Sequence, residues 1–139
     1  MIKSSLLCLS LVVGLSACST LSPQTKFDKP DNLLFNIKEL NTFPLSVQRD
    51  ERLCEDDKAD DQKCPIKLYI DDFKAGDFYI NNSTTYYLKA NEYELTVKNC
   101  KEECQTFHTK INISEQLNNV TLVLSVDHNG KPFIINKKS

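Results

Sequence analysis

The chain of 139 residues contains no tryptophan, one methionine, two histidines and three glycines. It has no glycine-rich loop that could cradle a phosphate, and no serine lies in a G-x-S-x-G setting, so the patterns of nucleotide-binding proteins and serine hydrolases are absent. The formal net charge is −2 and no long basic run occurs, which argues against a nucleic-acid partner. Beyond residue 17, no apolar run approaches the length that crosses a bilayer.

An apolar segment follows a basic start. Lys3 precedes residues 6–15, LLCLSLVVGL, which suit the core of a signal peptide and are too short for a membrane-spanning helix. The segment closes with the tetrapeptide LSAC, which ends at Cys18. This pattern resembles the lipobox of bacterial lipoproteins. In that family a diacylglycerol is attached to the cysteine sulfur, and a peptidase then cuts before the cysteine.

The resemblance implies that residues 1–17 are removed and that Cys18 begins the mature chain, acylated on its sulfur and its amine by chains such as palmitate. Two or three acyl chains hold a protein on a membrane durably, whereas one does not. In the lipoprotein pattern of Gram-negative bacteria, an aspartate after the cysteine retains the protein at the inner membrane. Ser19 stands there instead, which implies attachment to the outer membrane, with the domain in the periplasm or at the cell surface. The alternative is an ordinary secretory signal that leaves Cys18 as a free thiol.

The remaining cysteines predict disulfide bonds. Cys8 is removed with the signal and Cys18 carries lipid, so four are left: Cys54, Cys64, Cys100 and Cys104. An even set in an exported protein predicts two disulfides, with three possible connectivities. The spacing favours pairs 54–64 and 100–104, because each pair brackets a short polar stretch between apolar runs. The crossed pairing 54–100 and 64–104 would place residues 54–64, which we call the acidic loop, beside the tip of the second pair. A zinc site would need C-x-x-C spacing, so no metal is expected.

From residue 32 onwards apolar and polar residues alternate with a period of two, which predicts half-buried strands. The predicted strands are LLFNIKEL, FPLSVQ, IKLYID, DFYIN, TTYYLKA, YELTVK, TFHTKINI, VTLVLSV and PFIIN. Only ISEQLNN suggests a helical turn. Many short strands predict one all-β domain over residues 32–139, a small antiparallel β-sandwich. Residues 18–31 are polar, contain two prolines and predict a flexible tether.

Two hairpins carry stronger signals. Asn129-Gly130 lies between two apolar runs and predicts that residues 120–126 and 132–136 pair antiparallel. VKNCKEECQTF predicts another hairpin, in which Cys100 and Cys104 face each other closely enough for a disulfide.

The stretch IKLYIDDFKAGDFYINNSTTYYLKANEYELTVK resembles a PEGA domain, a small β-sandwich module of bacterial envelope proteins. Asp72 stands where that family has glycine, and Asn91 is expected to supply a left-handed turn conformation in place of the family's proline-glycine turn. The resemblance implies a scaffold or binding role and carries over no catalytic residue. A transthyretin-like sandwich of another family would fit the same residues.

Other candidate sites are few. His108 is predicted to lie on a strand surface and His128 in a turn, with no free thiol to pair with either, so no enzymatic activity and no cofactor are expected. The loop CEDDKADDQKC is interpreted as a solvated, disulfide-closed loop, with a weak calcium site as the alternative. Tyr79, Tyr86 and Tyr87 suggest an aromatic surface for carbohydrate, or else the half-buried edge of a core.

Two functions follow from these features. The first is a lipid-anchored envelope lipoprotein that acts as a non-catalytic binding or structural module, held on the membrane at Cys18 and docked on an envelope protein partner. The alternative is an adhesive surface lipoprotein that binds a ligand or glycan at its aromatic strands.

The anchor is tested by a Cys18→Ala variant. Because acylation precedes cleavage in the lipoprotein pattern, the variant should accumulate as an uncleaved precursor without lipid, as read by mass spectrometry of the N-terminal peptide. The unaltered protein should be recovered with outer membranes in a Gram-negative source, and recovery with inner membranes would contradict the sorting prediction.

Overall fold

The structure is a computed structural model that describes residues 28–117 and 120–138. It contains eight strands: β1 (Thr42–Arg49), β2 (Ile66–Ile70), β3 (Phe73–Phe78), β4 (Ser83–Lys89), β5 (Asn91–Cys100), β6 (Cys104–Ile113), β7 (Val120–Val126) and β8 (Pro132–Lys138). The described residues contain no helix.

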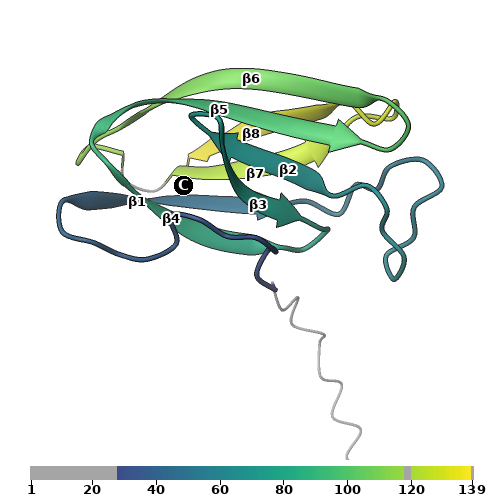
Figure 1. Cartoon of the computed structure of the whole chain (residues 1–139), viewed down its shortest axis with the longest axis horizontal. Helices are drawn as coiled ribbons and strands as arrows, with labels where there is room; N and C mark the ends of the chain where they lie inside the picture. Colours follow the sequence, from purple (N-terminus) through teal and green to yellow (C-terminus); the bar gives the residue numbers. More distant parts are fainter. Residues whose placement is uncertain (1–27, 118–119, 139) are drawn as a thin grey trace, which may run out of the picture.

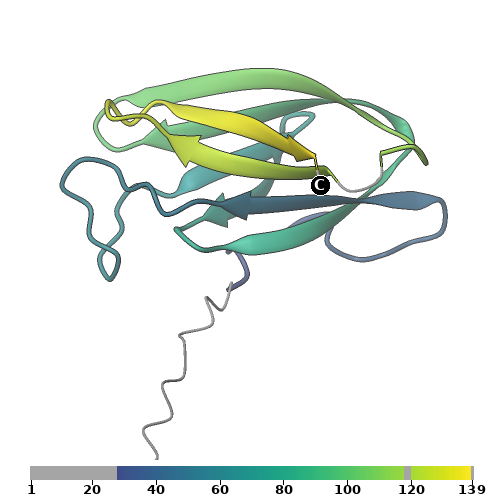
Figure 2. The same ribbon diagram turned by 180° about the vertical axis from the view of Figure 1, so that it is seen from behind.

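The strands form two sheets of four, with the orders β4-β1-β7-β8 and β3-β2-β5-β6. The sheets lie face to face as two layers, so the predicted β-sandwich is confirmed (Figures 1 and 2). All neighbouring strands are antiparallel except β1 and β7, which pair in parallel. The first sheet is therefore mixed, which strand patterns alone do not reveal because both orientations place alternate residues inward.

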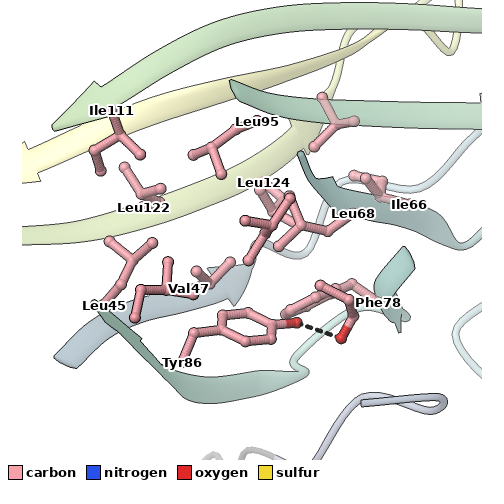
Figure 3. Close-up of a cluster of buried hydrophobic side chains, with 14 of the residues drawn as sticks. Leu45, Val47, Ile66, Leu68, Phe78, Tyr86, Leu95, Ile111, Leu122 and Leu124 are labelled. Atoms are coloured by element: carbon pink, nitrogen blue, oxygen red, sulfur yellow. Dashed lines mark hydrogen bonds between the residues drawn. The ribbon is translucent and has the colours of Figure 1, made fainter. Parts of the chain in front are cut away.

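Alternate residues of both sheets fill the space between the layers. Leu45 and Val47 of β1 are fully buried, as are Ile66 and Leu68 of β2. Figure 3 shows side chains from the two sheets pointing toward one another, among them Leu95, Ile111, Leu122 and Leu124. Burial of this apolar surface, at about 25 cal/mol per Å², is the main force holding the layers together.

Tyr86 links the two layers through a hydrogen bond. Its side chain is fully buried, and its hydroxyl donates to the carbonyl of Ala75 on the opposite sheet at 2.9 Å (Figure 3). Burial, with a smaller contribution from Asp77, raises the pKa of this phenol above its usual range. Gly76 makes the approach possible, because a Cβ at that position would lie 2.8 Å from the Tyr86 oxygen.

The two predicted hairpins are confirmed. Val126 pairs with Pro132 across the Asn129-Gly130 turn, where Gly130 has φ +78°. Cys100 faces Cys104 across the tip of the β5–β6 hairpin. Both predicted disulfides, 54–64 and 100–104, are also present.

Other predictions of local structure were wrong. Residues 33–40 do not form a strand, because left-handed conformations at Asn32 (φ 54°), Phe35 (φ 56°) and Asn41 (φ 60°) interrupt the extended backbone. The strand expected over residues 77–81 ends at Phe78 and starts at Phe73. Of the segment that suggested a helical turn, residues 114–117 form a single non-helical turn closed by a hydrogen bond from Leu117 N–H to the Ser114 carbonyl, and residues 118–119 lie outside the described residues.

The expected left-handed turn at Asn91 is also wrong. Asn91 is already part of β5, and the chain crosses there from one sheet to the other instead of forming a hairpin. The left-handed positions of the preceding β2–β3 turn are Asp71 and Asp72, with φ of 47° and 66°. In a chain with so little glycine, these aspartates adopt a conformation that most other residues avoid.

The segment before β1 closes one side of the sandwich. Pro30 is buried, and the backbone from Asp28 to Phe35 bonds to edge strands of both sheets, so docked structure begins within the stretch predicted as tether. The bonds are Ser83 N to Asp28 O, Asp31 N to Asp77 O, Asp77 N to Asp31 O, Leu34 N to Ala75 O and Tyr87 N to Phe35 O. The edges of β3 and β4 are thereby covered, which protects them from pairing with other chains.

Candidate binding end held by two disulfides

Three connections meet at one end of the sandwich, and we call this region the disulfide end. It comprises residues 52–64, the β5–β6 tip at residues 100–104 and the β7–β8 turn at residues 127–131. Figure 1 shows all three on the same side of the molecule, opposite the loop that precedes β1. Strands of both sheets lead into this end, so its loops rest on the rigid part of the fold.

A buried arginine joins the disulfide end to the core. Arg49 ends β1 at an inward-facing position, and only 1% of its surface is exposed. One guanidinium nitrogen, Nη1, donates to the carbonyls of Phe78 (2.7 Å) and Cys64 (3.1 Å), and Nη2 donates to that of Arg52 (3.2 Å).

The guanidinium is charged although it is buried. Burial lowers the pKa of Arg49 to about 10, and nearby Asp50 and Asp57 oppose that shift, so the group stays protonated at neutral pH. Within the described part of the chain, no carboxylate lies within ion-pair distance of it. Its charge is therefore satisfied mainly by backbone carbonyls, which fixes where the three segments bearing them lie.

A buried amide performs a similar role on the other sheet. Asn99 lies at an inward position of β5 and is 3% exposed. Its Nδ2 donates to the carbonyl of Gly130 at 2.8 Å and contacts the sulfur of Cys54 at 3.0 Å. The Cys54–Cys64 disulfide, itself buried, is thereby packed between the acidic loop and the β7–β8 turn.

The acidic loop folds around Asp57. One oxygen of this carboxylate accepts hydrogen bonds from the backbone N–H groups of Lys63 and Cys64, each at 3.0 Å. Lys101, at the tip of the β5–β6 hairpin, lies 3.6 Å from the other oxygen and donates to the carbonyl of Glu55. The acidic loop and the hairpin tip are thus neighbours. From the sequence, this contact between the acidic loop and the hairpin tip was expected only with the crossed disulfides 54–100 and 64–104. The structure shows the contact together with the disulfides 54–64 and 100–104.

A polar cavity of about 290 Å³ opens between these segments. Its lining includes the buried Cys54–Cys64 disulfide and Asn99, the exposed Lys101 and the half-buried Gln105. Four further lining residues carry carboxylates: Glu55, Asp56, Glu102 and Glu103. Because Lys101 is engaged with Glu55 and Asp57, the cavity presents an excess of negative charge.

The alternative of a weak calcium site finds little support in the positions of the acidic side chains that the structure describes. Among the described residues, one group has its potential ligand atoms close together, and it consists of Cys54, Asp57 and Cys64. Both sulfurs are joined in a disulfide, which removes the thiolates that a metal would bind. One oxygen of Asp57 is already bonded to two backbone N–H groups.

Neither histidine lines this cavity. His108 is exposed on β6, as predicted, and its Nδ1 lies 2.8 Å from the hydroxyl oxygen of Thr96. His128 is exposed in the β7–β8 turn, beside a shallow hollow that Arg52 and Leu53 also line.

The three tyrosines do not form one exposed aromatic surface. Tyr86 is a fully buried core residue. Tyr79 and Tyr87 are half-buried, as the core-edge alternative predicted. The period-two pattern places Tyr86 inward and Tyr87 outward, which means that the two rings cannot share one binding face.

Comparisons of this chain with protein-family models, with curated proteins and with solved structures found no match. The lipobox and PEGA resemblances therefore stay predictions from the residues. The predicted signal peptide, Cys18 and most of the tether lie outside the described residues. Among residues 28–117 and 120–138, no helix is long and apolar enough to span a membrane.

The burial of Arg49 and Asn99 could have been predicted from the sequence, although the strand predictions did not include it. Leu45 and Val47 face inward, so Arg49 is the next inward position of the same strand; Asn99 follows Val97 in the same way. A polar residue that continues an inward series marks a buried hydrogen-bonding group.

The two disulfides should contribute unequally to stability. Replacing Cys54 and Cys64 with alanine should lower the free energy of unfolding by about 3 kcal/mol or more, because the closed loop is longer and the bond is packed in the core. Replacing Cys100 and Cys104 should cost about 2 kcal/mol, because the loop is short and Cys104 is exposed. Urea unfolding of both double variants measures the difference, and a larger loss from the second pair would refute this ranking.

Proposed function

We propose that this protein is a lipid-anchored envelope lipoprotein whose domain is a non-catalytic binding module, and that the disulfide end docks a protein partner of an envelope assembly. The anchor is Cys18, in the outer membrane if the source is Gram-negative. The observation that carries the docking surface is the negatively charged cavity between two disulfide-closed segments.

Rigidity supports a binding role for this end. The acidic loop is closed by one disulfide and bonded by Arg49, Asp57 and Lys101 to the core and to the neighbouring hairpin. A loop that is ordered before binding loses little conformational entropy when a partner docks. Long loops that are fixed on a rigid scaffold are common sites of recognition.

The charge of the cavity indicates the chemistry of the partner. Glu102 and Glu103 are exposed at the hairpin tip, across the cavity from Glu55 and Asp56. A partner surface with lysine or arginine side chains would complement these carboxylates and would associate faster at low salt. The implied PEGA-like scaffold role agrees with a docking function of this kind.

The proposal is tested with a charge reversal at the cavity. The chain with a C-terminal affinity tag is crosslinked in intact envelopes and purified, and the partner should be recovered in near-stoichiometric amounts. Glu103→Lys should reduce that recovery about tenfold, because it places a cation in the cavity. Glu115→Lys makes the same change of charge at an exposed position outside the cavity and should leave recovery unchanged.

Two results would contradict the proposal. If both variants recover the partner as well as the unaltered chain does, the cavity is not the docking surface. If no stoichiometric protein is captured although the protein is acylated and present, the binding role itself is wrong.

A further inference from the structure

Exposed apolar side chains are concentrated on one loop at the end opposite the cavity. In the described part of the chain, the exposed large apolar residues are Leu34, Phe35, Ile37, Leu40, Phe73 and Ile135. Four of them fall within residues 34–40, and the Phe73 ring packs edge-on against that of Phe35, with centroids 6.4 Å apart. We call residues 34–40 together with Phe73 the apolar loop. Soluble domains rarely leave such a concentration exposed without a use for it.

The apolar loop projects from the sandwich. Ile37 is 75% exposed and Leu40 is 90% exposed, and neither lines a described cavity. The loop is attached at its start, where Leu34 N–H donates to Ala75 and Phe35 accepts from Tyr87. At its end, the backbone N–H and carbonyl of Glu39 are both hydrogen-bonded to the hydroxyl of the nearby Thr42. Protruding aliphatic side chains on a loosely attached loop suit a fluid apolar phase better than the pocketed contacts of a protein interface.

The length of chain outside the structure keeps this loop near the membrane. Nine residues separate Cys18 from Asp28, where the described chain is bonded to β4. Even fully extended, they span about 33 Å. An acylated Cys18 would therefore keep Asp28, and the covered edge that begins there, within about 33 Å of the lipid surface, a distance that the apolar loop can bridge.

The charge around the loop excludes an electrostatic attraction to anionic lipids. Residues 28–41 contain two lysines, at positions 29 and 38, and three acidic residues, at positions 28, 31 and 39. Membrane contact here would depend on apolar burial and would be insensitive to salt.

We infer that the apolar loop inserts Ile37 and Leu40 into the interfacial layer of the bilayer that holds Cys18. This second contact fixes the orientation of the domain. Because the apolar loop and the disulfide end lie at opposite ends of the sandwich, the cavity then faces away from the membrane (Figure 1). The inference rests on the proposed lipid anchor, and the experiment below separates the two.

The absence of tryptophan makes a direct test possible, because a single introduced tryptophan reports only its own surroundings. Leu40→Trp places the reporter on the loop, and Ile135→Trp places it on β8, at an exposed apolar position away from the loop. Both acylated proteins are purified at full mature length and reconstituted in vesicles of phosphatidylethanolamine and phosphatidylglycerol. Brominated lipids should quench the emission at position 40 at least twofold more strongly than at position 135. Added salt should not change that ratio.

Each other outcome is decisive. Equal quenching at the two positions in vesicles that carry the acylated protein would overturn the loop inference and leave the anchor standing. Shielding of position 40 in whole envelopes but not in vesicles would also overturn it, in favour of a protein occupant. A protein without acyl mass that does not float with the vesicles would reject the anchor itself.

Discussion

The Arg49 guanidinium is a buried charge that donates hydrogen bonds to three backbone carbonyls. One belongs to Phe78, the last residue of β3, and the other two belong to Arg52 and Cys64, the two ends of the segment 52–64. Removing such a group from water costs several kcal/mol, and hydrogen bonds to charged donors return part of that cost. The geometric result is that β1, β3 and the acidic loop hold one arrangement. The disulfide closes the loop, but a disulfide alone would leave it free to pivot, whereas Arg49 and Asn99 set its position on the sandwich.

The covered edges, the apolar loop and the polar cavity lie at different places on the domain. Residues 28–35 cover the edges of β3 and β4, and the chain from Cys18 enters at that covered side. The apolar loop continues from the same segment, while the three connections that line the polar cavity lie at the opposite end of the sandwich (Figures 1 and 2). Under the proposed function, the covered edge and the apolar loop lie nearest the membrane, and the charged cavity lies at the end that docks a partner. This arrangement suits a protein that presents a binding surface at a fixed distance from a membrane.

Much of the sandwich was predictable, because inward residues such as Leu45, Ile66 and Leu95 repeat with the period of a strand and turn residues separate the runs. Local cysteine spacing also identified both disulfides correctly. The prediction for residues 33–40 was wrong, because apolar and polar residues alternate there as they do in a strand. Left-handed residues on both sides of the segment and at Phe35 interrupt the extended backbone, and most of the apolar side chains are exposed. The parallel pairing of β1 with β7 depends on contacts far apart in sequence. The disulfide end was missed because the strand predictions did not use Arg49 and Asn99, the buried polar residues that continue the inward series of β1 and β5.

The most direct test of this account is the stability of Arg49→Met compared with that of Arg52→Met, measured by urea unfolding with both disulfides intact. If Arg49 organises the disulfide end, its replacement removes the guanidinium donor from the carbonyls of Phe78, Cys64 and Arg52 and should lower the free energy of unfolding by about 3 kcal/mol. Replacement of the exposed Arg52 side chain should change it by less than about 0.5 kcal/mol. Methionine has a similar length, and replacing a buried charge with an apolar side chain is in some proteins neutral or stabilising. An Arg49→Met protein as stable as the unaltered one would therefore contradict the account.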